Sequence, residues 1–170
     1  MDAQQFIAFL AQNAERIGSL ASHVTEEQAR WKPASDSWSV LEVINHLYDE
    51  EREDFRVRVD YILHKPGQPW PLTDPQAWVT PREYNQRDLA ESLEGYFEER
   101  HKSIDWLKTL TSADWEKSET APWGGVLRAG DLLAAWVAHD IHAMRQLSEL
   151  HYAWTQRLAE PYEVGYAGEW

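Results

Sequence analysis

The sequence predicts an all-α protein, a four-helix bundle with a long crossover loop between its second and third helices. Four long segments repeat apolar residues every three to four positions, which is the spacing of one face of a helix. A proline-rich stretch, residues 65–86, separates the second segment from the third. Strand-like alternation never extends beyond a few residues. Amphipathic helices with one long connection pack most simply as a four-helix bundle.

The chain of 170 residues has the length of one domain. We therefore expect a single domain that spans residues 1–170. Apolar periodicity predicts its first long helix over residues 4–24. Thr25 precedes two glutamates, as a helix cap does, and predicts a short helix over residues 26–30 that ends before Pro33.

The second long helix is predicted to begin at a cap, Ser37 or Ser39, and to continue to about residue 65. Five of the eight prolines fall within residues 65–86, and proline inside a helix removes a hydrogen bond and clashes with the preceding turn. This stretch is therefore predicted to be a loop. Because loops longer than about 15 residues are uncommon unless they are functional, we expect it to form a pocket wall or a subunit contact.

The third long helix is predicted over residues 87–110 and the fourth over residues 129–152. Between them, a polar capping sequence predicts a one-turn helix around Trp115, and Pro122 with two glycines predicts a tight turn. The tail, residues 159–170, contains proline and glycine and is expected to be extended.

The chain is rich in tryptophan, with ten in all. Aromatic side chains bury large areas, so we expect six of them to fill the core or a subunit contact. The alternative is that they line a small-molecule pocket. The six are Trp31, Trp38, Trp106, Trp115, Trp136 and Trp154.

Charge and composition exclude several functions. There are 29 acidic against 16 basic residues, a net charge of −13 that repels nucleic acid. The absence of cysteine excludes disulfides and thiolate chemistry, so any metal must be held by His, Asp or Glu. The first residues contain neither a basic region nor a long apolar run, as a signal peptide or membrane anchor would. We expect a cytoplasmic protein without nucleic-acid or membrane partners.

Three histidines are candidate metal ligands. His46 lies in the predicted second helix, and His139 and His142 lie in the fourth. Two histidines three residues apart lie on one side of a helix and can bind one ion. A third from a facing helix completes a set that leaves coordination positions open for water or substrate. The alternative is that each is a partly buried hydrogen-bonding group.

Three segments together resemble one family. They are WSVLEVINHLYDEE at 38–51, GGVLRAGDLLAAWVAHDIHAMRQL at 124–147 and PYEVGYAGEW at 161–170. In this order they are similar to the DinB-like superfamily of metal-dependent enzymes, in its branch with W-S-x-x-E-V-x-x-H-L-x-D-x-E and H-D-x-H-H-x-x-Q segments. The resemblance covers nearly the whole chain. It implies a four-helix bundle, a homodimer and a three-histidine site for a divalent ion such as zinc or nickel.

Compared by position, His46 and His139 match the first two histidines of that family. The resemblance implies a third ligand four residues after His139, and this sequence has Ala143 there. His142 matches a neighbouring histidine that the resemblance does not mark as a ligand. Helical geometry also turns His142 away from the buried face and leaves His46 off the centre of its own apolar face.

Two carboxylates could replace the missing ligand. Glu50 lies one turn beyond His46, and Asp49 precedes it. Both offer oxygen donors that suit a divalent cation, and two histidines with one carboxylate form a workable set. The alternative is that Asp49, Glu50, Glu51 and Glu53 form a solvated helical face.

Asp140 is predicted to lie near the buried centre of the fourth helix, where an unpaired carboxylate is costly. We expect it to accept hydrogen bonds from a tryptophan N–H, a backbone N–H or an arginine. Arg145 and Gln146 are expected to make polar contacts near the site, with simple surface exposure as the alternative.

Two functions follow from these residues. The first is a metal-assisted transferase, isomerase or hydrolase that uses His46 and His139, with water, His142 or Glu50 completing the coordination. Among the better-understood relatives that the resemblance implies are thiol-dependent transferases and isomerases. The second is a non-catalytic, dimeric binding or stress-associated protein that has lost the site through Ala143. Its tryptophans and loop would then line a small-molecule pocket or a subunit contact.

Overall fold

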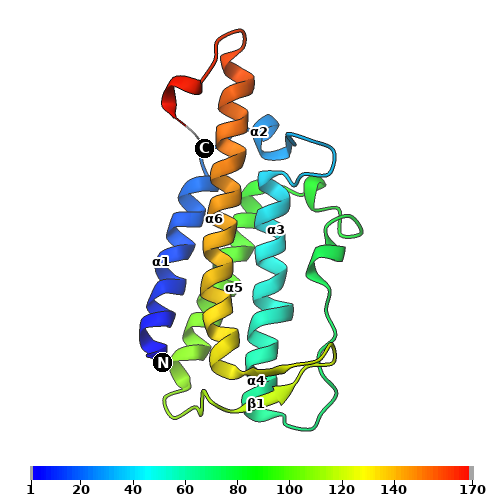
Figure 1. Cartoon of the computed structure of the whole chain (residues 1–170), viewed down its shortest axis with the longest axis vertical. Coiled ribbons are helices and arrows are strands. Elements are labelled where there is room, and N and C mark those ends of the chain that lie inside the picture. Colours follow the sequence, from blue (N-terminus) through cyan, green and yellow to red (C-terminus); the bar gives the residue numbers. More distant parts are fainter. Residues whose placement is uncertain (1, 169–170) are drawn as a thin grey trace.

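The computed structural model describes residues 2–168 and places four long helical segments side by side (Figure 1). α1 (Ala3–Ala21) and α6 (Ala129–Ala159) run in one direction, while α3 (Val40–Glu50) and α5 (Leu89–Thr109) run in the other. This is the four-helix bundle that the apolar periodicity predicts. None of the described helices is long and apolar enough to cross a membrane.

Polar caps begin the helices close to where the sequence predicts them. The Asp2 side chain accepts hydrogen bonds from the first backbone N–H groups of α1. Thr25 caps α2 (Glu26–Arg30) in the same way. Ser39 and Glu42 form a reciprocal capping box at the start of α3, which satisfies two N–H groups that the helix leaves unpaired.

The predicted second helix is continuous, but its winding changes in the middle. After α3, residues Glu51–Phe55 form a π-helix, η1, and α4 (Arg56–His64) then completes the segment. A π-helical turn is wider than an α-helical turn, so it rotates the residues that follow. Such turns often lie at functional sites, and this one begins directly after Glu50.

Residues 65–88 return the chain along the outside of the bundle to the start of α5 (Figure 1). The segment contains two short 3-10 helices, η2 (Pro75–Trp78) and η3 (Tyr84–Gln86). Because it runs the length of the bundle, α3 and α5 point in the same direction.

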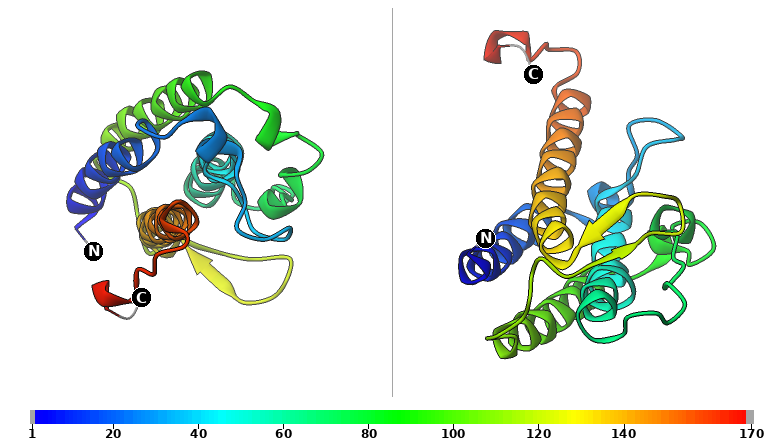
Figure 2. Two further views of the ribbon diagram at one scale, coloured as in Figure 1. Left: turned by 90° about the horizontal axis from the view of Figure 1, so that it is seen from above. Right: turned by 60° about the horizontal axis from the view of Figure 1, so that its bottom comes forward.

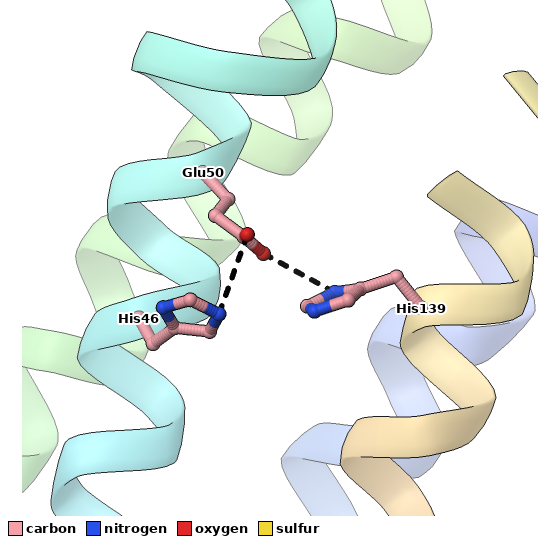
Figure 3. A group of neighbouring side chains, drawn as sticks. All are labelled: His46, Glu50 and His139. Atoms are coloured by element: carbon pink, nitrogen blue, oxygen red, sulfur yellow. Dashed lines mark ion pairs between the residues drawn. The ribbon is translucent and has the colours of Figure 1, made fainter. Parts of the chain in front are cut away.

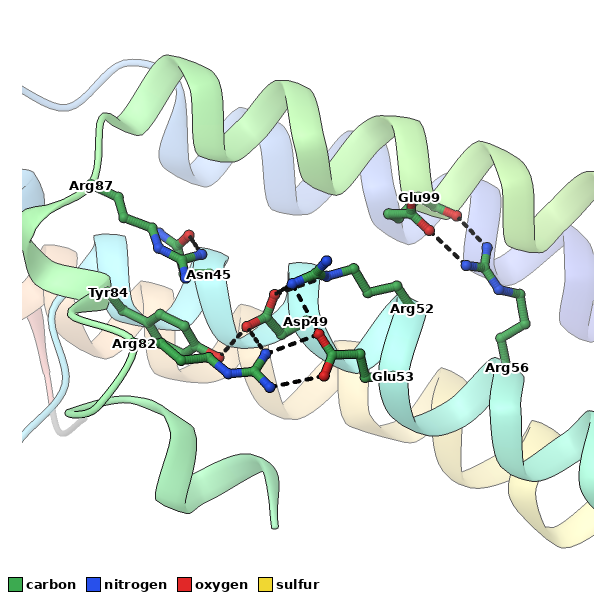
Figure 4. A network of polar contacts seen from close by, with 9 residues as sticks. All are labelled: Asn45, Asp49, Arg52, Glu53, Arg56, Arg82, Tyr84, Arg87 and Glu99. Atoms are coloured by element: carbon green, nitrogen blue, oxygen red, sulfur yellow. Dashed lines mark hydrogen bonds and ion pairs between the residues drawn. The ribbon is translucent and has the colours of Figure 1, made fainter. Parts of the chain in front are cut away.

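Asp49 of α3 anchors this return segment (Figure 4). The Tyr84 hydroxyl donates a hydrogen bond of 2.6 Å to the Asp49 carboxylate, and Arg82 forms ion pairs with both Asp49 and Glu53. Burial opposes ionisation of Asp49, but the hydrogen bonds from Tyr84, Arg82 and Arg52 outweigh it and hold the pKa of Asp49 below its usual value. The segment is thus fastened to the helix that carries His46 and Glu50.

The prediction of a one-turn helix around Trp115 is wrong. The chain makes a turn there and then forms a small antiparallel hairpin, in which β1 (Ser118–Thr120) pairs with β2 (Val126–Arg128). The backbone carbonyl of Trp115 accepts a hydrogen bond over 2.9 Å from Gly130 at the start of α6. Hydrogen bonds to the start of α6 and between β1 and β2 therefore satisfy the backbone N–H and carbonyl groups of this region without a helix.

The fourth helix is longer than predicted, because α6 continues to Ala159. Its extra turns keep an apolar contact: Trp154 is 9% exposed and packs edge-to-face on Trp31, with ring centroids 5.3 Å apart. The tail expected to be extended contains a 3-10 turn at Gly165–Ala167. The last two residues of the segment PYEVGYAGEW lie outside the described residues.

Apolar side chains form three clusters along the bundle. Trp136 is 1% exposed and stacks on Phe55 in one of them. Trp106 and Trp115 are partly buried against two clusters, and Trp38 packs against the third. The predicted core role is therefore confirmed for Trp136 and Trp154, which are buried. The other four are half-buried, and Trp38 also lines a cavity.

A charged side chain lies at the centre of the bundle. Arg100 of α5 is 1% exposed, and its Nη1 donates to the Leu10 carbonyl of α1 over 3.1 Å. Both terminal nitrogens donate to Asp140 of α6 over 2.7 Å, and Nη2 also pairs with Glu51 of η1 over 2.6 Å. The expectation that Asp140 accepts hydrogen bonds from an arginine is confirmed. One guanidinium thus contacts the other three helical segments.

Gly18 allows α1 to lie close to α5, and replacing it tests this packing. A Cβ atom at Gly18 would lie 2.4 Å from Cζ of Phe97. Overpacking of this kind costs about 1–3 kcal/mol, whereas alanine gains about 1 kcal/mol in helix propensity. We expect Gly18→Ala to lower the free energy of unfolding in urea.

Combining Gly18→Ala with Phe97→Leu should recover part of that loss, because the shorter side chain makes room for the methyl group. If Gly18→Ala has the same effect with and without the Phe97→Leu substitution, the ring is not the obstacle.

Candidate metal centre

Three side chains from two helices meet between α3 and α6 (Figure 3). His46 and Glu50 lie one turn apart on α3, and His139 projects from α6. One ligand atom from each lies within 4.8 Å of the other two. No other set of three His, Asp or Glu side chains converges in this way among residues 2–168.

The spacing of these atoms fits a metal ion. Glu50 lies between the two rings, with Oε1 3.3 Å from Nε2 of His46 and Oε2 3.2 Å from Nδ1 of His139. Oε2 is close to His139 but not aligned with it as a hydrogen bond. An ion about 2.1 Å from each ligand places neighbouring donors roughly 3 to 3.5 Å apart. The two contacts of Glu50 have this spacing, and all three ligand atoms lie within 4.8 Å of one another, so small side-chain movements would let the three residues share one divalent ion.

Glu50 carries a proton at neutral pH in the metal-free protein. Burial raises its pKa to about 9, and the nearby carboxyl groups of Asp54 and Glu51 act in the same direction. A buried carboxyl group with so high a pKa is poorly compensated by its surroundings. A divalent cation would supply the missing positive charge.

Both histidines are neutral at that pH, which is the form that binds metals. Burial lowers the pKa of His46 to about 4, and His139 lowers it further, although the backbone of Pro75 and the charge of Asp49 oppose this. Burial also lowers the pKa of His139. The contacts with Glu50 are therefore contacts between neutral groups.

A cavity of about 760 Å³ is lined by His46 and His139, two of the three candidate ligands. Its walls come from α3, α6, the loop before α3 and the return segment. Trp38 covers His46, with ring centroids 4.7 Å apart, and Gln76 closes one side. A volume of this size is typical of small-molecule sites. From the proline-rich segment, Gln76 contributes to this wall.

The cavity wall also contains two positions singled out in the sequence. His142 is exposed and lines the cavity, but it lies outside the group of three. Ala143, one turn beyond His139, is 5% exposed and presents only a methyl group. Gln146 lines the same wall, whereas Arg145 is 71% exposed and pairs with Glu149 on the surface.

The alternative of a solvated acidic face is wrong for Asp49, Glu50 and Glu51, which are buried, and only Glu53 is partly exposed. Asp49 contacts the return segment, Glu50 contacts the two histidines, and Glu51 contacts Arg100. Helical periodicity alone does not predict this, because the return segment covers one side of α3 and the π-helix alters the winding.

The pair formed by Glu51 and Arg100 was not predicted from the sequence. A signal was present, because Arg100 lies in phase with Tyr96 and Ile104 on the apolar face of its helix. A cation at such a position requires a buried anion as partner.

Comparisons with known proteins agree with this fold. YfiT from Bacillus subtilis, described as a probable metal-dependent hydrolase with an unusual four-helix bundle topology, matches with a TM-score of 0.78. The match covers 88% of this chain and 86% of YfiT at 20% identity. A mutant of the mycothiol-dependent maleylpyruvate isomerase matches with a TM-score of 0.64 and 13% identity, over 84% of this chain and 60% of that one.

Among curated protein sequences there is no match. The family model described as the DinB superfamily matches residues 10–147, which is most of the chain. The chain belongs to the DinB superfamily.

Proposed function

We propose that this protein is a metal-dependent enzyme whose divalent ion, zinc or nickel, is bound by His46, Glu50 and His139. The observation that carries the proposal is the convergence of three ligand atoms within 4.8 Å at the edge of a cavity. The neutral state of both histidines and the high pKa of Glu50 support it. Two histidines and one carboxylate leave coordination positions open, as a catalytic site needs.

A bound divalent ion would polarise a substrate or lower the pKa of a water molecule, which suits a transferase, an isomerase or a hydrolase. The residues of this chain would bind and orient the substrate. Trp38 and Leu47 provide apolar surface in the cavity, while Gln76 and Gln146 offer amide hydrogen bonds. YfiT is described as a probable metal-dependent hydrolase, and the second structural neighbour is an isomerase.

Glu50 takes the role of third ligand in this proposal because Ala143 cannot. Glu50 and His46 are four residues apart on one face of α3, so their side chains reach the same point. The exposed position of His142 gives it a place in the cavity wall rather than in the ligand set.

The alternative is a non-catalytic binding or stress-associated protein of the same fold, which the methyl group of Ala143 favours. In that case the cavity would bind a small molecule without metal. We also propose the homodimer expected from the resemblance and the cytoplasmic location expected from the sequence; light scattering of the purified protein tests the first.

Metal titration tests the ligand set. We expect the protein, freed of metal by a chelator, to bind Zn²⁺ or Ni²⁺ at near-unit stoichiometry. His46→Ala and His139→Ala should each weaken binding by at least about a hundredfold, because a first ligand contributes more than an outer partner does. His142→Ala is the matched control and should change the affinity by less than about threefold. A wild-type protein indifferent to both ions would favour the non-catalytic alternative.

Restoring a third histidine tests the geometry from the side of α6. Ala143→His places an imidazole one turn beyond His139, facing the cavity. We expect Zn²⁺ affinity to rise by at least about tenfold, since a fourth protein ligand completes a tetrahedral set. Gln146→His, at the next cavity-lining position, is the control. An equal gain from both variants would show that a histidine anywhere in the cavity is sufficient.

The pH dependence of binding tests the role of Glu50. Below pH about 9 the ion must displace the Glu50 proton, so Zn²⁺ affinity should rise with pH, by up to about tenfold per unit, between pH 6.5 and 8.5. Burial lowers the pKa of both histidines, so they contribute less than Glu50 to this pH dependence. Chelator competition measures the affinity, and calorimetry in buffers of different ionisation enthalpy counts the proton released.

Glu50→Gln should bind more weakly at pH 8.5 and should lose most of the pH dependence. If it keeps the wild-type slope, another group supplies the proton.

A further inference from the structure

The two helices that carry the candidate ligands pack less on each other than on the other two long helices. α6 packs mainly on α1, and α3 packs mainly on α5; Figure 2 (left) shows the four long helices from above. α3 and α6 share one apolar cluster, which includes Leu47 and Leu147, and the cavity lies between them beside His46 and His139. A polar contact that joins the two helices would add to this packing in setting the distance between His139 and the two ligands on α3.

The contacts of Arg100 bridge this separation. Its Nη2 pairs with Glu51 Oε1 over 2.6 Å and donates to Asp140 Oδ1 over 2.7 Å. Glu51 directly follows Glu50 in the chain, and Asp140 directly follows His139. A single guanidinium nitrogen thus contacts the next residue after a candidate ligand on each of the two helices.

The surroundings make this link rigid. Arg100, Glu51 and Asp140 are each no more than 1% exposed. Trp136 of α6 donates its indole N–H to the same oxygen of Glu51 over 2.7 Å, which adds a second bond between η1 and α6. Asn13 of α1 donates to Asp140 over 3.3 Å. Charge-assisted hydrogen bonds between planar groups in a dry interior are strong and directional.

We propose that Arg100 is a positioning residue for the metal centre: through Glu51 and Asp140 it fixes Glu50 and His139 at the separation that metal binding requires. This inference rests on the proposed function for its metal readout, but the geometry it describes exists without the ion. It assigns a role in the site to a side chain on α5, a helix that contributes none of the three candidate ligands.

The alternative is that Arg100 only stabilises the fold. The energetics of buried ion pairs allow an experiment to distinguish this from a positioning role. Replacing a buried set of charges by apolar residues of similar volume is often neutral or stabilising. The triple variant Glu51→Leu, Arg100→Met, Asp140→Leu removes every charge of the set together, so that no ion is left buried without a partner. It removes the directional link while keeping the core filled.

Co²⁺ is the probe, because its visible absorption reports coordination geometry. We expect the triple variant to fold with a Tm at or above that of the wild type. Its Co²⁺ affinity should fall by about tenfold to a hundredfold, with an altered absorption spectrum. Val59→Ala is the control for a general loss of stability, because Val59 lies in an apolar cluster that contains none of the candidate ligands and none of the three charged residues. It should leave the Co²⁺ absorption spectrum unchanged. Wild-type affinity and spectrum in a folded triple variant would overturn the proposal.

Arg100→Lys decides the question if the triple variant does not fold. Lysine keeps the charge but cannot donate from a planar fork to two carboxylates at once. We expect weaker Co²⁺ binding and a changed spectrum; binding indistinguishable from the wild type would overturn the proposal.

A metal-free crystal structure of the variant separates this inference from the proposed function. The ring centroids of His46 and His139 lie 5.6 Å apart in the wild-type protein. If wild-type protein binds no Co²⁺, the proposed function fails, but the positioning role still predicts a longer distance in the variant. An unchanged distance would contradict it.

Discussion

The buried guanidinium of Arg100 is the interaction on which the arrangement of the bundle depends. It contacts α1 through the Leu10 carbonyl, α6 through Asp140 and the π-helical turn through Glu51. A buried cation with two buried carboxylates is costly to form and more costly to break, because any partner left alone is an uncompensated charge. Helices packed in a different register would leave Arg100, Asp140 or Glu51 buried without a partner. These three side chains therefore favour one arrangement of the helices.

That arrangement gives three consecutive residues of one helix three separate tasks. Asp49 fastens the return segment, Glu50 joins the candidate metal ligands, and Glu51 binds Arg100. The return segment, held by Asp49, contributes Gln76 to the cavity wall and brings the backbone of Pro75 beside His46. Because these three residues are consecutive, a displacement of one would also displace the other two. The attachment of the return segment, the position of the candidate ligands and the contact with Arg100 therefore depend on one another. This coupling explains why so many acidic side chains are buried in a protein with a net charge of −13.

Much of the fold follows from the sequence, because apolar periodicity, caps and prolines are local signals. The short helix α2 was predicted at its observed bounds, and Asp140 was predicted to be buried with a hydrogen-bond donor, for which an arginine was one of three candidates. The candidate site was harder to predict, since it depends on which chain segments cover α3. Helical geometry left His46 off the centre of its apolar face, yet the residue is 5% exposed because Trp38 packs on it and the backbone of Pro75 lies beside it. Glu50 is buried between His46 and His139.

A crystal structure of the protein grown with Zn²⁺, with diffraction data collected on both sides of the zinc absorption edge, would show whether His46, Glu50 and His139 share one divalent ion. We expect one strong anomalous peak about 2.1 Å from a donor atom of each of the three residues. A peak bound instead by His142, or the absence of any peak between α3 and α6, would contradict it.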